Sequence, residues 1–254
     1  MDTRLVNRAV DVARRPITAV EGHLLPVLCR LSQRFSAAAG GDQRPAFYDI
    51  DQACPAFRIL DRAYPVIREE MESVLSYKDR IPRYHDLDRG QGPISQGDAP
   101  DRNWRVFMLR APVGSATANQ ARCPRTTALL RQIPGLFEAF FSILDAGKSI
   151  PAHNAAYHGY LRYHLGLRVP KDNPPMMRVK DQFHVWEEGR SILFDDSWNH
   201  EVYNQSRDIR VVLIADVLRP LSPGLYAANW LIARVLMRHT EEAKQFLANM
   251  KKYS

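Results

Sequence analysis

The sequence predicts a mainly β fold, a sandwich or barrel, with helices at the N- and C-terminal ends. Three observations favour this class. From Trp104 onward, short segments rich in β-branched and aromatic residues follow one another, with turn residues between them. Few helical patterns interrupt these segments. Before this region, and again after Pro220, apolar residues recur at helical spacing. Many short strands with few intervening helices are typical of sandwiches and barrels.

The predicted strands lie between Trp104 and Leu218 and are separated by turns at Asp145–Gly147, Asp172–Pro175 and Glu188–Gly189. They are Trp104–Arg110, Ala139–Leu144, Gly159–Val169, Met176–Trp186, Ser191–Phe194, Glu201–Tyr203 and Ile209–Leu218. The chain is therefore expected to comprise a helical N-terminal extension and loop (1–102), a β core (103–220) and a C-terminal helix (221–254).

The N-terminal extension shows a helical stripe of apolar residues from Val6 to Leu31, in which Pro16 and Pro26 are expected to kink or restart the helix. A second helix is predicted over Ala63–Ser76. Residues 36–46 are expected to form a linker, and residues 79–102, rich in Pro, Gly, Asp and Arg, a long loop. The stripe indicates packing on the core, or on a partner helix or membrane surface.

Composition places the protein among ordinary globular proteins. Of 254 residues, 45% are apolar and 25% are charged. Three cysteines without a CxxC pair favour a reducing compartment, and the N-terminal sequence lacks the features of a signal peptide. No apolar run approaches the ~18–20 residues that span a bilayer. We therefore expect a cytoplasmic protein.

The net charge of +7 is concentrated at the two ends of the chain. Residues 1–35 carry six arginines against three acids, and residues 219–254 carry six basic residues against two acids. Such ends are either solvated helix faces or a surface for anionic lipid, which leaves a peripheral membrane contact open. No nucleic-acid-binding motif with interleaved aromatic residues is present, so a nucleic acid is not expected as a partner.

Histidines indicate where the chemistry lies. Five of the eight fall between His153 and His200, inside the strand region, and imidazole is a ligand for iron, zinc, copper and nickel. Ten residues after His200, Arg210 begins an otherwise apolar strand. An arginine in such a strand requires an anion, because burial of an unpaired charge is costly. That anion is either an internal Asp or Glu or a carboxylate ligand held by both arms of the guanidinium.

Two segments carry a resemblance to a known family. IPAHNAAYHGYLRYHLGL and HVWEEGRSILFDDSWNHEVYNQSRDIRVVLIADVLRP resemble the aspartyl/asparaginyl β-hydroxylases, Fe(II)- and 2-oxoglutarate-dependent oxygenases. The resemblance extends from about Asn103 to Pro220. It implies a double-stranded β-helix, a jelly roll of the cupin kind. It also implies hydroxylation of a C–H bond, in which O2 is consumed and 2-oxoglutarate is converted to succinate and CO2.

The resemblance also implies roles for single residues. His153 and His200 match the two iron ligands. Arg210 matches the arginine that binds the distal carboxylate of 2-oxoglutarate. The remaining matches are Ser142 as an assistant to that arginine, Arg162 and His164 at the other carboxylate, and Trp104 near the pocket mouth. Asp195 and Asp196 are expected to orient the loop before His200 rather than to bind metal.

Several alternatives remain open at the sequence level. The carboxylate ligand of the wider superfamily would lie two residues after His153, where this chain has Ala155. The resembled family lacks that carboxylate too, but so do halogenases, in which chloride occupies the position. The substrate is a peptide Asp or Asn, a free or carrier-bound metabolite, or a lipid A-type acyl chain at a membrane surface. A non-catalytic module that binds 2-oxoglutarate is a further alternative. The sequence does not indicate an oligomeric state.

Overall fold

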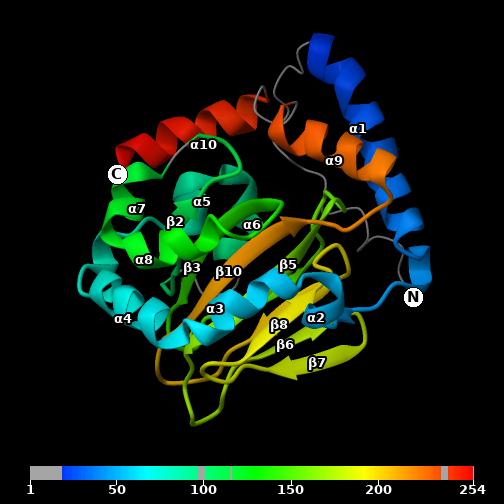
Figure 1. The fold of residues 1–254 in the computed structure, drawn as a ribbon. Helices are drawn as coiled ribbons and strands as arrows, with labels where there is room; N and C mark the ends of the chain where they lie inside the picture. Colours follow the sequence, from blue (N-terminus) through cyan, green and yellow to red (C-terminus); the bar gives the residue numbers. More distant parts are fainter. Residues whose placement is uncertain (1–18, 97–100, 115, 236–239, 254) are drawn as a thin grey trace, which may run out of the picture.

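Two antiparallel β-sheets pack face to face in the computed structural model, which describes residues 19–96, 101–114, 116–235 and 240–253 (Figure 1). The larger sheet has the strand order β1-β8-β5-β10-β3-β2, and the smaller β4-β9-β6-β7. The strands are β1 (Phe47–Tyr48), β2 (Trp104–Arg110), β3 (Leu136–Leu144), β4 (Ile150–His153), β5 (Tyr160–Arg168), β6 (Met176–Val179), β7 (Gln182–Val185), β8 (Ser191–Phe194), β9 (His200–Tyr203) and β10 (Arg210–Leu218). This is the predicted double-stranded β-helix.

The predicted strands are confirmed with three corrections. The segment Met176–Trp186 forms two strands rather than one, because Lys180 adopts a positive φ of 57° and turns the chain. The strands β1 and β4 were not predicted. β4 is an edge strand of four residues that contains Pro151, and proline in a short run obscures the alternation by which strands are recognised.

The larger sheet is covered on both faces, which explains its nearly continuous apolar strands. All nine residues of β3 and all nine of β10 are buried. One face packs against helices and includes Phe141 and Leu213. The other faces the smaller sheet and includes Phe140 and Val212. Since side chains alternate along a strand, every second residue of these strands points into the space between the sheets.

Helices lie outside the two sheets, and helices also precede the first strand and follow the last one (Figure 1). The helices α3, α4 and α8 cover the outer face of the larger sheet. The α-helices are α1 (Ala19–Ala38), α2 (Ile50–Ala53), α3 (Arg58–Arg62), α4 (Tyr64–Leu75), α5 (Tyr84–Leu87), α6 (Gly92–Gln96), α7 (Thr117–Arg122), α8 (Pro124–Leu130), α9 (Pro223–Arg234) and α10 (Glu241–Lys252). Short 3-10 turns are η2 (Gly41–Gln43), η3 (Pro55–Phe57), η4 (Lys78–Arg80) and η5 (Arg89–Gln91).

The N-terminal expectations hold only in part. The helix α1 continues through Pro26 instead of restarting there, whereas Pro16 lies outside the described residues. The predicted loop 79–102 contains α5 and α6 as well as two 3-10 turns. The predicted linker 36–46 is not a free linker, because Arg44 and Ala46 are buried. Their side chains are part of the packed structure. The composition of a short polar segment does not indicate such contacts, so the prediction missed them.

The two C-terminal helices differ in what they expose. Phe246 and Met250 of α10 are buried, whereas Trp230 and Leu231 of α9 are each 48% exposed. In Figure 1, α9 lies alongside α1, whose Val27 is also exposed. None of the described helices is long and apolar enough to cross a membrane.

If the basic C-terminal segment bound anionic lipid at the barrel mouth, its basic residues would be expected to share one face there. The described basic residues of this segment do not do so. Arg234 is half-buried and donates to the Leu136 carbonyl, and Lys251 and Lys252 are exposed at the end of α10, a separate helix. Arg238 lies outside the described residues. The opposite expectation, that the apolar residues of this segment are buried, is not met either, because Leu231 of α9 is half-exposed.

A buried ion cluster joins the N-terminal segment to the loops that flank the two sheets. The Asp195 carboxylate, fully buried, accepts from Arg44 Nε at 2.8 Å and lies 2.9 Å from Arg219 Nη2. It also accepts from the backbone N–H and hydroxyl of Ser197. Arg219 in turn donates to the carbonyls of His158 and Tyr160. One carboxylate therefore fixes the loop before β9 and the loop before β5.

We predict that Asp195→Asn lowers the free energy of unfolding by about 3–5 kcal/mol, because it leaves two buried guanidinium groups without their counter-charge. Urea denaturation followed by circular dichroism measures this change. Asp208→Asn is the matched control, since Asp208 pairs with the exposed Arg168 at the surface and such pairs contribute little. Equal effects of the two substitutions would contradict the role assigned to the cluster.

Candidate active site

Two histidines face each other on neighbouring strands of the smaller sheet. His153 ends β4, His200 begins β9, and the two residues are direct cross-strand partners. Their ring centroids are 4.1 Å apart. Residues that are 47 positions apart in sequence are therefore brought close enough to bind one ion.

Each of these rings is held in the same way. Nδ1 of His153 lies 2.8 Å from the Pro151 carbonyl, and Nδ1 of His200 lies 2.9 Å from the Trp198 carbonyl, in both cases two residues earlier. A carbonyl only accepts, so Nδ1 carries the proton in both rings and Nε2 keeps its lone pair. This tautomer and this orientation suit a metal-binding histidine.

Burial keeps both rings neutral. Desolvation lowers the pKa of His153. It also lowers the pKa of His200 to about 3, and the electrostatic effect of the nearby His153 adds to that shift. Neutral imidazole is the form that binds a metal. Among the described residues, no group of three or more His, Cys, Asp or Glu side chains surrounds a common point. The pair thus fits a two-histidine centre without a protein carboxylate, as Ala155 indicates.

Arg210 is fully buried without an anionic partner among the described residues. Its side chain is 1% exposed, its Nη1 lies 3.5 Å from Ser142 Oγ, and its Nε has no hydrogen-bond acceptor there. The guanidinium lies over the ring of Trp186, 4.5 Å from its centroid. Burial lowers the pKa of Arg210 to about 9. Such a group is suited to an external carboxylate, which would supply the missing charge and acceptors.

Ser142 and Trp104 complete this end of the interior. Trp104 Nε1 donates to Ser142 Oγ at 2.9 Å, and that oxygen is also the nearest polar atom to Arg210. Trp104 is 4% exposed and packs edge-on against Tyr84. It therefore lies buried beside Ser142, and its expected position near the pocket mouth stays a prediction. The tryptophan fixes the serine hydroxyl, which is left with a proton to donate.

His164 also points into the interior and lacks partners. It is 5% exposed, and neither of its ring nitrogens forms a hydrogen bond within the described residues. Desolvation, followed by the nearby Arg210 and Arg162, holds its pKa well below the usual range. Neutral, buried and unpaired, it has one donor and one acceptor to offer a ligand in the space between the sheets.

Arg162 lies on the same face of β5, but it is already paired. Its Nε and Nη2 donate to the two oxygens of Asp216 at 2.8 and 2.7 Å, and its Nη1 lies 3.2 Å from Asp196 Oδ2. The sequence analysis expected Arg162 to contact a cosubstrate carboxylate. In the structure its guanidinium is bound by two protein carboxylates, so a third would have to share it.

Two acidic residues of this interior were missed by the sequence analysis. Asp216 pairs in register with Arg162 on one side and with Glu138 on the other, so the three form a row across β5, β10 and β3. Glu138 and Asp216 are single acids in apolar strands, the same signal that singled out Arg210. The argument that led to Arg210 applied equally to them.

The carboxyl groups of this row are crowded. Burial and the nearby Asp216 raise the pKa of Glu138 to about 8, against the opposing effect of Arg162. Burial likewise raises the pKa of Asp196 to about 7. Among the described residues, neither oxygen of Asp196 has a hydrogen-bond partner. Within the described residues, the interior thus has a cation without an ion-pair partner, Arg210, at one end and an excess of acidic groups at the other.

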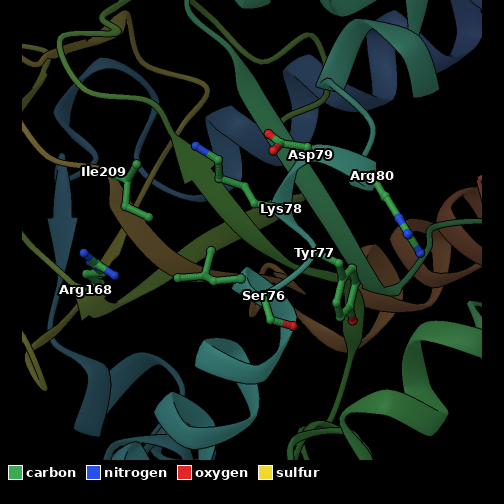
Figure 2. A pocket seen from close by; sticks show the side chains of 8 residues that line it. Ser76, Tyr77, Lys78, Asp79, Arg80, Arg168 and Ile209 are labelled. Carbon is green, nitrogen blue, oxygen red and sulfur yellow. The ribbon is translucent and has the colours of Figure 1, made fainter.

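One surface hollow in the described part of the chain is separate from this site. It measures about 560 Å³ and lies between the end of α4 and the ends of β5 and β10 (Figure 2). Of its charged residues, Lys78 pairs with Asp145 and Arg168 pairs with Asp208. None of the candidate site residues lines it.

Sequence comparisons place these residues in a wider context. A family model described as aspartyl/asparaginyl beta-hydroxylase matches residues 61–220, so the match begins within the segment expected to be an N-terminal extension. The ornithine lipid ester-linked acyl 2-hydroxylase of Rhizobium tropici is 36% identical over 210 residues, which cover 82% of this chain and 73% of that protein.

More distant similarities are also found. The aspartyl/asparaginyl beta-hydroxylases of Homo sapiens and Mus musculus are 28% and 33% identical over 170 residues, 63% of this chain. The matched region is 21% of each of those proteins. Among solved structures, a cupin 2 conserved barrel domain protein from Salinispora arenicola is 11% identical, with a TM-score of 0.30 over 54% of this chain and 86% of that one.

The crowded acids predict a dependence of stability on pH. A carboxyl whose pKa is raised by folding binds a proton in the folded state that the unfolded chain has released. The free energy of unfolding should therefore fall as pH rises from about 4.5 through about 8. Glu138→Gln removes one such group. The free energy of unfolding of this variant, relative to that of the original chain, should therefore increase steadily over this pH range.

Urea denaturation of the two chains at pH 5, 6.5 and 8 checks this expectation. Glu242→Gln, a change at an exposed position of α10, should show a constant difference from the original chain at all three values. A constant difference for Glu138→Gln as well would refute the raised pKa of Glu138.

Proposed function

Because the chain belongs to the aspartyl/asparaginyl β-hydroxylase family, a family of 2-oxoglutarate-dependent dioxygenases, we propose that it hydroxylates an acyl chain of a membrane lipid with Fe(II) and 2-oxoglutarate. The observation that carries the oxygenase part is the combination of two facing histidines with a buried, unneutralised Arg210. A non-catalytic member of the fold would have no need to retain both.

In this proposal each residue has a defined task. His153 and His200 hold Fe(II) through Nε2, with Nδ1 bonded to the chain. Arg210 and the Ser142 hydroxyl bind the distal carboxylate of 2-oxoglutarate, and His164 lies between that end and the acidic row. When bound, iron and 2-oxoglutarate supply the oxidising power for O2-dependent hydroxylation. The protein positions the target C–H bond and excludes water through the buried lining of both sheets.

The lipid substrate is supported first by similarity. The Rhizobium tropici acyl hydroxylase matches 82% of this chain and most of its own length, whereas the peptide-type relatives match 63% of this chain and about a fifth of theirs. Peptide Asp or Asn, metabolite and acyl substrates were all open in the sequence. The similarity favours the acyl chain over the peptide and the metabolite.

Support for a lipid also comes from α9. Its exposed Trp230 and Leu231 adjoin the buried Asn229, which is bonded to the Tyr157 hydroxyl and the Gly159 carbonyl. Both of these residues belong to the loop that leads from His153 to β5. A tryptophan beside leucine suits a membrane interface, because the indole ring is apolar with one polar edge. The apolar surface is thus anchored to the loop that follows a proposed iron ligand.

We predict that Arg210→Lys weakens 2-oxoglutarate binding by about 1.5–3 kcal/mol, since an ammonium cannot reproduce the two parallel hydrogen bonds of guanidinium to carboxylate. Anaerobic titration of the Fe(II)-loaded protein, followed by its visible charge-transfer band, measures the dissociation constant. Arg131→Lys, at an exposed position, is the control. Unchanged affinity in Arg210→Lys would remove Arg210 from the site.

The substrate is tested by direct competition between classes. We expect the Fe(II)-loaded protein, given 2-oxoglutarate and O2, to add 16 mass units to an ornithine lipid in detergent micelles with equimolar succinate. A peptide with Asp and Asn residues, assayed in parallel, should remain unmodified. Hydroxylation of the peptide instead would refute the lipid proposal, and a chlorinated product in chloride buffer would refute hydroxylation.

A further inference from the structure

The acidic row described above has more negative groups than it needs for its own structure. Asp196 and Asp216 contact the Arg162 guanidinium, and Glu138 lies on the other side of Asp216 in the strand register. Arg162 is bonded to Asp216 through two nitrogens, which is a complete pair without Glu138. Glu138 thus adds a buried acid that the fold does not require.

Glu138 is also left without a partner. It is 7% exposed, and no side chain or backbone group of the described residues forms a hydrogen bond or ion pair with its carboxyl group. A carboxyl group in the interior that no group of the described residues neutralises is suited to a partner from outside the chain. The inner face of β3 aims it into the space between the sheets.

A second unpartnered group faces the same point. Tyr84, from α5, is also 7% exposed, and its hydroxyl forms no hydrogen bond with any described residue. Its ring is fixed between Trp104 and Phe140, with centroids at 4.8 and 5.9 Å. Phe140 follows Glu138 by two residues on the same face of β3, so the Tyr84 ring packs beside the acidic row. Burial, with Glu138 nearby, raises the pKa of Tyr84.

We propose that Glu138, Asp216 and the Tyr84 hydroxyl form a binding site for a primary ammonium group of the substrate. A protonated amine has three N–H donors and no acceptor, and this site offers three acceptors. The amine would bring a positive charge beside Glu138, which favours the ionised form of that carboxyl group. Asp216 has acceptor positions left after its two bonds to Arg162, because a carboxylate accepts about four.

The position of the site suits it to orient the substrate for the reaction. It lies at the Arg162 end of the interior, whereas Arg210 lies at the opposite end of the same face of β10. The amine of the substrate headgroup would bind at this site. Its position would then determine which carbon of the substrate lies next to the histidine pair. This inference rests on the proposed lipid function and names the chemical group by which the lipid is recognised.

The test compares two substrates within each protein. One is the ornithine lipid with its free side-chain amine, and the other is the same lipid with that amine acetylated. We expect the original chain to have a kcat/KM roughly 10- to 100-fold higher for the free amine, the range for hydrogen bonds to a charged group. This comparison requires no variant and is therefore independent of folding.

Glu138→Gln then identifies the residue. Glutamine preserves size and hydrogen-bonding capacity but not the charge, so the preference for the free amine should fall to within about threefold of unity. Glu242→Gln, a charge change on exposed α10, should retain the preference of the original chain. Because the two lipids are compared in the same protein, a general loss of activity cancels from the ratio.

The outcomes separate the two proposals. If the original chain hydroxylates both lipids equally well, or if Glu138→Gln keeps the full preference, the ammonium site is wrong and the lipid function stands. If the original chain hydroxylates neither lipid, the proposed function fails, and the ammonium site fails with it.

Discussion

The fully buried carboxylate of Asp195, shared between Arg44 and Arg219, is the interaction on which the remaining geometry depends. It joins three segments distant in sequence: the stretch after α1, the loop before β9 and the end of β10. Two of these hold a proposed iron ligand in place, because Asp195 fixes the loop leading to His200 and Arg219 binds carbonyls of the loop that follows His153. Removal of the Asp195 charge would leave both guanidinium groups buried without a counter-charge, so the cluster depends on this one carboxylate.

This cluster explains why an oxygenase core needs a segment before the first predicted strand. Arg44 lies in a stretch whose composition indicates a linker, yet it donates to Asp195 and Ser197 and lies over the ring of Trp198. The loop before His200 is thus covered by residues from outside the core. A truncation at residue 103 would remove the partner of a buried acid and expose the outer face of the larger sheet now covered by α3 and α4.

The sequence was informative wherever a pattern is local. Strands such as β3 and β10 were predictable because a nine-residue run with seven apolar residues and one or two charges has few other structures available. His153, His200 and Arg210 stood out by spacing and by a charge in an apolar strand. What the sequence did not predict depends on pairing across strands. The partnership of Arg162 with Asp216, and the absence of a partner for Glu138, follow from register, which a single chain without its three-dimensional contacts does not reveal.

The unequal distribution of charge along the interior has a consequence for how ligands enter. Above about pH 8, where Glu138 is ionised, Arg210 at one end and the surplus carboxylates at the other produce an electric field along the interior, in a medium that screens it weakly. A dianion that enters is drawn toward Arg210 and repelled from the acidic end, whereas a cation moves in the opposite direction. Two ligands of opposite charge would therefore be sorted to opposite ends before either forms a hydrogen bond, and neither would block the place of the other.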